Sequence, residues 1–373
     1  MLQTTIPQSG RAPGGLYGDS AVAVIGAGIA GAWQALLFAQ AGHAVTLYER
    51  DAPEMIAATS HWAGGMLAPW CEAEVAEPVV TRLGLRSLDM WRAELPETPF
   101  NGSLVVAHAR DRGDFERFAA MTSHHQRLDA AGVTALEPSL DGRFREGLFF
   151  PDEGHVTPRA VLPQLHARLA AAGGTVRFNT EANADDLDGI VIDCRGLFAR
   201  DAQTKLRGVK GEMIMIETDE VSLSRPVRLM HPRWPLYVIP RGNGLFMLGA
   251  TSLESEDARV CVRSALELMS AAYAVHPAFA EARILEFGSG LRPAFPDTLP
   301  RRDDLDLVAA LQRRLGPAAL RHHVEIQSDG EMVAFVVELA QQRVDMPGRN
   351  LPVFAIDDHA HCITSLSITP RCT

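Results

Sequence analysis

Residues 21–31 read AVAVIGAGIAG, an apolar run followed by three glycines spaced as GxGxxG. The run 21–25 is typical of a short buried strand. Gly26 permits a tight turn, Gly28 lets a phosphate group approach the backbone at a helix N-terminus, and Gly31 lets the helix pack closely on the strand. This stretch therefore predicts a strand, a turn and a helix that together bind a dinucleotide.

The residues that follow complete a β-α-β unit. Residues 32–41 predict a helix that ends before Gly42, and residues 43–48 predict a second strand. Glu49 lies about twenty residues beyond the glycines, where a carboxylate accepts hydrogen bonds from both hydroxyls of an adenosine ribose. The glycines alone also fit a tight turn in another α/β protein, and they do not distinguish a nicotinamide from a flavin nucleotide.

The apolar stretch 21–39 is long enough to imitate a membrane span and is interrupted only by Gln34. Its glycines, its lack of basic flanks and its change from β-rich to Ala/Leu-rich sequence indicate a strand followed by a helix instead. We therefore expect no membrane-spanning segment and no membrane partner.

Composition excludes several classes of function. The chain has 373 residues, enough for two domains at about 150 residues each. A net charge of -11 argues against nucleic acid as a partner. The five cysteines are scattered without a CxxC pair, so they indicate neither a disulfide framework nor a zinc site, and a reducing cytoplasm fits best. Residues 1–20 lack the basic start and apolar run of a secretory signal and predict a flexible leader.

A loop rich in small residues, TSHWAGGMLAP at 59–69, follows Glu49, and its glycines let the backbone approach a flat ring. Taken alone, the loop also fits a mobile surface segment. With this loop the chain resembles the glycine oxidases of thiamine biosynthesis, within the D-amino-acid oxidase family of flavoproteins that bind FAD. The resemblance covers about residues 20–300 and rests on GAGIAG with Glu49, SHWAGGMLAP at 60–69, VIDCRGL at 191–197, YVIPRGNG at 237–244, GAT at 249–251 and GLRPAFPD at 290–297.

The resemblance implies an α/β fold with a doubly wound, Rossmann-like FAD-binding domain and a second, substrate domain whose sheet is mostly antiparallel. The implied division is a leader at 1–20, FAD-binding segments at 21–98 and 149–205, substrate-domain segments at 99–148 and 206–287, a return to the flavin site at 288–300, and a divergent segment at 301–373.

Local patterns add detail to these two domains. Residues 158–172 predict a helix with Thr157 as N-cap, Pro158 at its first position and Gly173 at its end, and His155 is expected in the preceding loop. Strands are predicted at 213–217, 236–240 and 245–249, with a hairpin turn at 242–244.

The resemblance also implies where FAD is held. The ADP half is expected at the N-terminal unit, and the flavin is expected beside the loop 61–67 and the strand end 191–197. Taken alone, Cys194 is at least as typical of a small buried residue at a strand end. The implied cofactor-binding residues are Gly26, Gly28, Gly31, Glu49, Arg50, Gly64, Gly65, Met66, Cys194 and Gly196.

Three residues are implied to bind substrate. Arg292 matches the arginine that the family uses as a bidentate clamp for the substrate carboxylate, and Tyr237 matches a tyrosine whose hydroxyl helps to hold it. Ser252 follows the next strand and is expected to face the same cavity. Taken alone, Arg292 is more typical of a solvated or paired arginine, and Tyr237 of an interfacial aromatic residue. We expect no side-chain base, because hydride leaves from a neutral amine, and no metal, because no pairs of ligands occur at a metal-site spacing.

The reaction implied by the resemblance is oxidation of glycine to its imine, with FAD reduced and then reoxidised by O2 to give H2O2. The imine would feed assembly of the thiamine thiazole ring. An oxidase or dehydrogenase of sarcosine, D-proline or a small D-amino acid is one alternative, and a catalytically impaired flavoprotein or an apoprotein is another. The sequence leaves open a homo-oligomer.

Beyond Pro300 the chain departs from the family, whose members continue with a strand and a glycine-containing turn that closes over the flavin. Here residues 303–315 predict an amphipathic helix and residues 332–339 a short apolar segment. His359, His361 and Cys362 fit a polar tail better than a metal cluster. Our hypothesis is a divergent or frame-altered C-terminus, which comparison with the encoding DNA would test.

Overall fold

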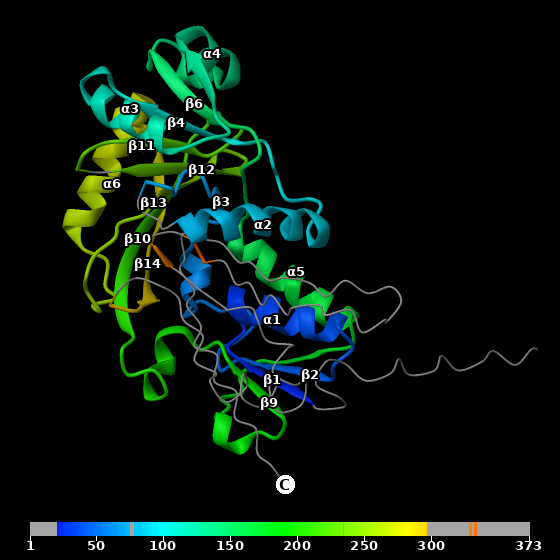
Figure 1. Cartoon of the computed structure of the whole chain (residues 1–373). Helices are drawn as coiled ribbons and strands as arrows, with labels where there is room; N and C mark the ends of the chain where they lie inside the picture. The colour runs from blue at the N-terminus through cyan, green and yellow to red at the C-terminus, as the bar shows by residue number, and fades with distance from the viewer. Residues whose placement is uncertain (1–20, 75–77, 234, 297–327, 330–331, 334–373) are drawn as a thin grey trace, which may run out of the picture.

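The computed structural model describes residues 21–74, 78–233, 235–296, 328–329 and 332–333. A parallel sheet occupies one half of it and a larger, mostly antiparallel sheet the other (Figure 1). The expected α/β class with a Rossmann-like layer is therefore confirmed. The predicted leader 1–20, the predicted helix 303–315 and the residues His359, His361 and Cys362 lie outside the described residues.

The parallel layer is built around the N-terminal glycine unit. Its strands stand in the order β8-β2-β1-β9, and every neighbouring pair is parallel. Helices α1 and α5 pack against each other on this layer (Figure 1), and α2 contacts α1 through Trp33 and Trp91. The elements are β1 (Val22–Ile25), α1 (Ile29–Gln40), β2 (Val45–Tyr48), α2 (Pro78–Glu94), α5 (Pro158–Ala171), β8 (Thr175–Arg177), η4 (Ala184–Asp186), β9 (Ile190–Asp193) and η5 (Gly196–Asp201).

Element boundaries in this layer differ from the predicted ones by a few residues. The first helix begins at Ile29 rather than at residue 32, because the backbone turns into a helix directly after Gly28. Strand β2 begins at Val45 rather than at residue 43, because the His43 N–H bonds the Phe38 carbonyl in the turn after α1. Thr157 holds the N-cap position of α5, but its side chain makes no capping hydrogen bond.

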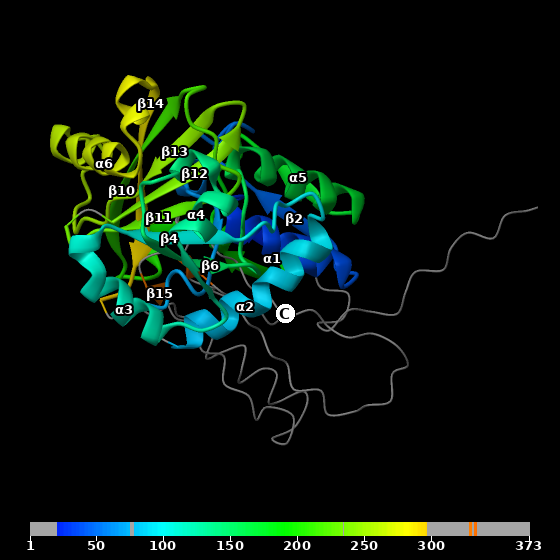
Figure 2. The same ribbon diagram turned by 90° about the horizontal axis from the view of Figure 1, so that it is seen from above.

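The larger sheet has the strand order β14-β10-β13-β12-β11-β4-β6-β5, in which only the β11–β4 pair is parallel. Helix α6 packs on β10, β12 and β13, and Figure 2 shows α6 and α5 on opposite sides of the molecule. The elements are β4 (Ser103–Ala107), η2 (Ala109–Asp111), α3 (Arg112–Met121), β5 (Gln126–Asp129), α4 (Ala130–Leu136), η3 (Pro138–Leu140), β6 (Glu146–Phe150), β10 (Arg207–Glu217), β11 (Val227–Met230), β12 (Leu236–Gly242), β13 (Leu245–Gly249), α6 (Val262–Val275), η6 (Pro277–Glu281) and β14 (Arg283–Ala294).

Several short elements lie outside these two sheets. They are η1 (Thr59–Trp62), the paired strands β3 (Met66–Leu67) and β7 (Gly154–His155), and the paired strands β15 (Ser328–Asp329) and β16 (Met332–Val333). His155, predicted in a loop, thus lies in strand β7 and is buried, because β7 pairs with β3. The three predicted strands of the larger sheet and the turn at 242–244 are present. The predicted boundary at 287/288 falls inside β14, and the domain division stays a prediction.

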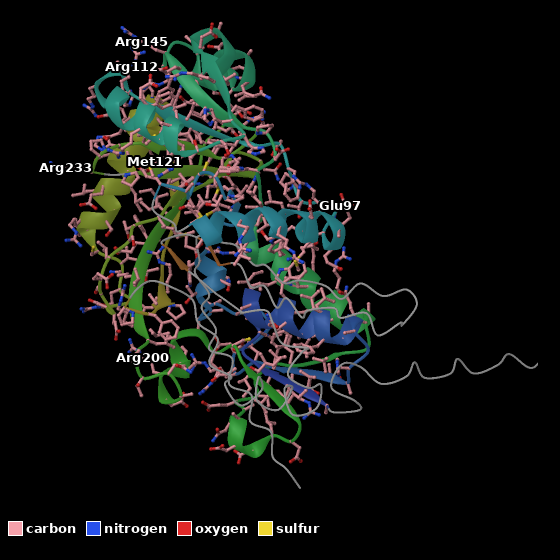
Figure 3. All side chains as sticks on the ribbon, in the orientation of Figure 1. Glu97, Arg112, Met121, Arg145, Arg200 and Arg233 are labelled. Atoms are coloured by element: carbon pink, nitrogen blue, oxygen red, sulfur yellow. The ribbon has the colours of Figure 1, made fainter. Side chains whose placement is uncertain are left out.

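Each half has its own apolar core. In the parallel half, Trp33 of α1 and Trp91 of α2 are fully buried and meet edge to face, with ring centroids 5.0 Å apart. Exposed charges such as Arg112 and Arg145 lie on the outside of the molecule (Figure 3). No helix in the described ranges is long and apolar enough to cross a membrane, and residues 21–39 form a strand, a turn and a helix as predicted.

The two halves meet where η1 lies directly on β14. A Cβ atom at Gly288 would stand 2.0 Å from Cε3 of Trp62, and one at Gly290 would stand 2.9 Å from Cγ2 of Thr59. The Thr59 hydroxyl donates a hydrogen bond to the Leu291 carbonyl at 3.0 Å. Glycine at both strand positions therefore allows this close contact between the halves.

We expect Gly288→Ala to destabilise the protein by about 1–3 kcal/mol, because its methyl group must displace the Trp62 indole. The matched control is Gly113→Ala in α3, where a Cβ meets nothing within 4 Å and where we expect a change within about 1 kcal/mol. Urea denaturation of both variants checks this. Equal stability of the two variants would contradict the proposed contact between η1 and β14.

Candidate active site

A cavity of about 410 Å³ opens where the carboxyl ends of β1, β2 and β9 meet η1 and β14. Parallel α/β sheets bind nucleotides at this edge. Six of the predicted cofactor residues line it, namely Gly26, Gly28, Glu49, Arg50, Cys194 and Gly196. We refer to it as the nucleotide cavity.

Two of the motif glycines are required by close backbone contacts. Gly26 has a φ of 96°, and a Cβ there would stand 2.4 Å from the Cys194 carbonyl oxygen. A Cβ at Gly31 would stand 1.8 Å from the Gly26 carbonyl oxygen. Gly31 therefore lets α1 pack on the turn, in the role predicted for it, and it is not among the residues that line the nucleotide cavity.

Glu49 is buried and connects the end of β2 to the glycine turn. One of its carboxylate oxygens accepts the Ala27 N–H at 2.7 Å, and the other accepts the Asp51 N–H at 3.0 Å. Since each carboxylate oxygen accepts more than one hydrogen bond, both can still accept a ribose hydroxyl. Beside it the Arg50 guanidinium lies 3.6 Å from the centroid of the Phe198 ring, and both residues line the cavity.

Ser60 is a lining residue that sequence reasoning missed. Its hydroxyl oxygen accepts the Ile29 N–H at 3.1 Å and so caps α1 from another part of the chain. Gly28, at the N-cap position, has no side chain to do this. The hydroxyl thus lies at the positive end of α1, where a glycine turn of this kind can bind a pyrophosphate. No local pattern could reveal this, because 31 residues separate the two partners.

A second, much smaller cavity adjoins the first, and Thr59 and Gly290 line both. Its other walls come from η1, the loop after it, β10, the end of β13 and β14: Trp62, Gly64, Gly211, Met213, Ala250 and Arg292. The fold thus brings predicted cofactor residues and the predicted substrate arginine to neighbouring cavities.

Arg292 is 3% exposed and pairs with Val209 of β10, and its side chain extends over Gly211 of the same strand. A Cβ on Gly211 would stand 3.9 Å from Nε of Arg292, so glycine leaves room for this long side chain. The Arg292 Nη2 donates a hydrogen bond to the Ser252 hydroxyl at 2.7 Å. Two of the three predicted substrate residues are therefore in contact.

Tyr237 lies elsewhere in the larger sheet. It is 2% exposed, its hydroxyl donates a hydrogen bond to the Glu72 carboxylate at 2.5 Å, and it is not among the residues that line either cavity. Its contact with a substrate carboxylate stays a prediction. Glu72, which is also 2% exposed, gave no sequence signal.

The loop that carries Gly64, Gly65 and Met66 is fixed to its surroundings. Gly65 has a φ of 74°, and a Cβ there would stand 2.1 Å from the Val156 carbonyl oxygen. Arg241 of β12 donates hydrogen bonds to the carbonyls of Val156, at 2.6 Å, and of Gly64. Gly64 lines the smaller cavity, whereas Gly65 and Met66 lie behind it, with Met66 1% exposed in β3.

Two buried titratable groups lie next to this loop. Burial, followed by the charge of Arg241, lowers the pKa of His155 to about 3, so the imidazole is neutral at physiological pH. Burial raises the pKa of the Glu153 carboxyl to about 7 although Ser103, Cys71 and Trp70 donate hydrogen bonds to it. Burial also raises the pKa of the Cys71 thiol, which is therefore not a reactive thiolate.

No group of three or more His, Cys, Asp or Glu side chains that could hold a metal ion occurs within the described ranges. The residues that line the nucleotide cavity instead supply backbone N–H groups, hydroxyls, the guanidiniums of Arg50 and Arg195, and the carboxylates of Glu49, Asp51 and Glu181. This set fits the ribose and phosphates of a dinucleotide rather than a metal.

Comparison with known proteins decides the family. Residues 21–314 match the family model DAO, described as FAD dependent oxidoreductase. The chain belongs to this family. It is accordingly an FAD-dependent oxidoreductase, and the nucleotide cavity contains the features that FAD requires: the glycine turn, the helix N-terminus and Glu49. The family match extends past Pro300, where we predicted divergence, and residues 315–373 lie outside it.

Individual relatives support this assignment. A Rhizobium etli protein named as a candidate thiamine biosynthesis oxidoreductase, ThiO, is 49% identical over 282 residues, which span 75% of this chain and 86% of the relative. D-amino-acid oxidase of Streptomyces coelicolor is 27% identical over 74% of this chain and 84% of its own length. The crystal structure of glycine oxidase from Geobacillus kaustophilus has the same fold, with a TM-score of 0.65 and 23% identity over 75% of this chain and 84% of that one.

The raised pKa of Glu153 predicts that the stability of the protein depends on pH. The unfolded chain releases the proton of Glu153 near its ordinary pKa of 4.5, whereas the folded protein keeps it up to about pH 7. Unfolding therefore releases a proton between these pH values, and this carboxyl lowers the stability as pH rises through the window. Glu153→Gln stays neutral throughout. We expect its free energy of unfolding, relative to the unaltered protein, to rise by about 2 kcal/mol from about pH 5 to about pH 8.

Urea denaturation at both pH values measures this difference. Exposed Glu97, labelled in Figure 3, provides the control variant Glu97→Gln, for which we expect no such trend. A Glu153→Gln variant whose relative stability does not change with pH would show that the buried carboxyl is already ionised at pH 5.

Proposed function

We propose that this protein oxidises glycine to its imine. FAD, when bound, would supply the two-electron acceptor for this oxidation, with O2 as the final oxidant that is reduced to H2O2. Glycine contributes a hydride from Cα and a proton from its amino group, and the imine takes up water to give glyoxylate and ammonia. The high identity to the Rhizobium etli relative, named for thiamine biosynthesis, supports use of the imine in making the thiamine thiazole ring.

The composition of the smaller cavity carries this proposal. Among the described residues that line it, Arg292 is the single charged side chain, and none is an Asp, Glu, His or Lys that could act as a base. Oxidation of a neutral amine by hydride loss needs a carboxylate clamp and correct alignment but no protein base. A guanidinium binds a carboxylate with two parallel hydrogen bonds. We infer that Arg292 holds the substrate carboxylate and that Ser252 orients its guanidinium, whereas a role for Tyr237, whose hydroxyl bonds Glu72, stays a prediction.

The walls of the same cavity favour a small substrate. We infer this because the bulky side chains of Trp62 and Met213 are among the residues that line this narrow cavity. A substrate panel with a peroxide assay tests this inference on glycine, sarcosine, D-proline and D-alanine. We expect the highest kcat/KM for glycine. A higher value for one of the others would assign the protein to that substrate, and peroxide from none of them would support the impaired-flavoprotein alternative.

Arg292→Ala should lower kcat/KM for glycine by about 100-fold with FAD retained, because removing one partner of a buried charge pair costs roughly 2–5 kcal/mol. Arg283→Ala is the control. Arg283 starts the same strand, is 71% exposed and pairs with Glu217, so its loss should leave glycine kinetics unchanged. Steady-state kinetics and the flavin content of each variant provide the test. Unchanged kinetics in Arg292→Ala would remove this residue from substrate binding.

A further inference from the structure

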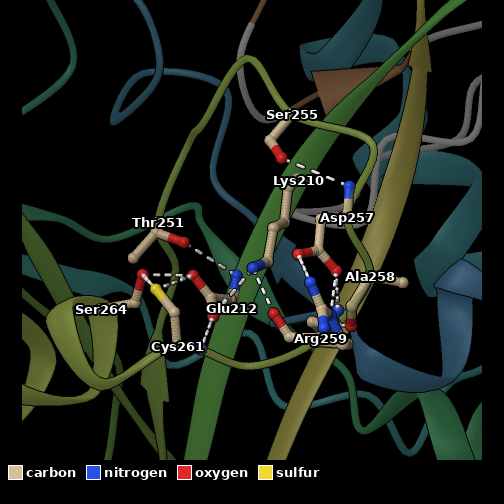
Figure 4. A network of polar contacts seen from close by, with 10 residues as sticks. Lys210, Glu212, Thr251, Ser255, Asp257, Ala258, Arg259, Cys261 and Ser264 are labelled. Carbon is tan, nitrogen blue, oxygen red and sulfur yellow. Dashed lines mark hydrogen bonds and ion pairs between the residues drawn. The ribbon is translucent and has the colours of Figure 1, made fainter.

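Strand β10 carries a buried ion pair on the face opposite to the one that the Arg292 side chain covers. Lys210 and Glu212 of β10 are 4% and 1% exposed, and Lys210 Nζ lies 3.2 Å from a Glu212 carboxylate oxygen (Figure 4). Side chains alternate along a strand. Since Arg292 lies over Gly211, the two charged side chains on either side of this glycine point to the opposite face of the sheet.

Thr251 and Leu253 pair with this part of β10, and Ser252 lies between them. The N–H and carbonyl of Lys210 bond the carbonyl and N–H of Leu253, at 2.8 and 2.9 Å. The Glu212 N–H bonds the Thr251 hydroxyl at 2.9 Å, and the Thr251 N–H bonds the Glu212 carbonyl at 3.2 Å. Ser252 is thus held between two fixed neighbours, on the same face as Gly211 and Arg292.

The ion pair also holds residues 259–261, which lie between β13 and α6, against β10. The Glu212 carboxylate accepts the Cys261 N–H at 2.6 Å and the hydroxyl of Ser264 in the first turn of α6. Lys210 Nζ donates to the Arg259 carbonyl (Figure 4). Burial alone would raise the pKa of Glu212, but hydrogen bonds from Ser264, Cys261 and Lys210 outweigh it and hold the pKa below its ordinary value. The carboxylate is therefore ionised and paired.

We propose that Lys210 and Glu212 are positioning residues for the substrate-carboxylate clamp. They hold residues 251–261 against β10 and thereby place the Ser252 hydroxyl where it orients the Arg292 guanidinium. This inference rests on the proposed function, because it assumes that Arg292 binds a carboxylate. A buried ion pair is weak evidence for stability in itself, since desolvation offsets the attraction of the charges. Because the ion pair lies on the opposite face of β10 from Arg292, we infer that it positions the clamp.

The test measures binding of acetate, the simplest carboxylate without an amine, to FAD-loaded protein by the change in flavin absorbance. We expect Lys210→Met to raise the Kd for acetate at least 10-fold with FAD content unchanged. Lys210→Arg, which keeps a cation, should restore binding to within about 3-fold of the unaltered protein. Glu217→Gln on the same strand removes an exposed partner of Arg283 and should leave the Kd unchanged.

The double variant Lys210→Met, Glu212→Gln leaves no unpaired buried charge, and it decides the question if the single variant fails to fold. The proposal expects this variant also to bind acetate at least 10-fold more weakly. Acetate binding like that of the unaltered protein, in either FAD-loaded variant, would overturn the inference while leaving the proposed function intact. Absence of acetate binding by the unaltered protein would contradict the proposed function itself.

Discussion

The contact between η1 and β14 is the constraint on which the candidate site depends. Thr59 and Trp62 lie against a strand that has glycine at 288 and 290, and no side chain could occupy either position without moving them. Because this contact joins the parallel half to the antiparallel half, Thr59 and Gly290 line both cavities. The nucleotide cavity and the cavity of Arg292 are neighbours for that reason, although their residues come from distant parts of the chain.

A second feature is that charged groups near the site are buried and held by several hydrogen bonds each. Taking an ion out of water is costly unless partners replace the lost hydration. Lys210 and Glu212 provide partners for each other and also bind backbone groups of residues 259 and 261. Glu153 instead takes the neutral form up to about pH 7. Such groups restrict the loops they bind, and those loops carry the residues that we expect to touch the cofactor and substrate.

Much of the fold could be predicted because its signals are local. Residues 21–49 contain a complete β-α-β unit, and the glycine spacing, the helix and Glu49 all indicate the same structure. The family resemblance supplied the antiparallel sheet. Ser60, Glu72 and Glu153 could not be found in this way, because their hydrogen-bond partners lie 31, 165 and 50 to 83 residues away in the sequence. His155 was wrongly assigned to a loop because two-residue strands such as β3 and β7 have no sequence period.

The proposed reaction requires a flavin at the first cavity beside a small amino acid that Arg292 holds at the second. Anaerobic addition of glycine to the purified, FAD-loaded protein tests it most directly. We expect loss of the visible flavin absorbance, its return on admission of O2, and formation of peroxide. A protein that binds FAD but whose absorbance stays unchanged at saturating glycine would rule out oxidation of glycine.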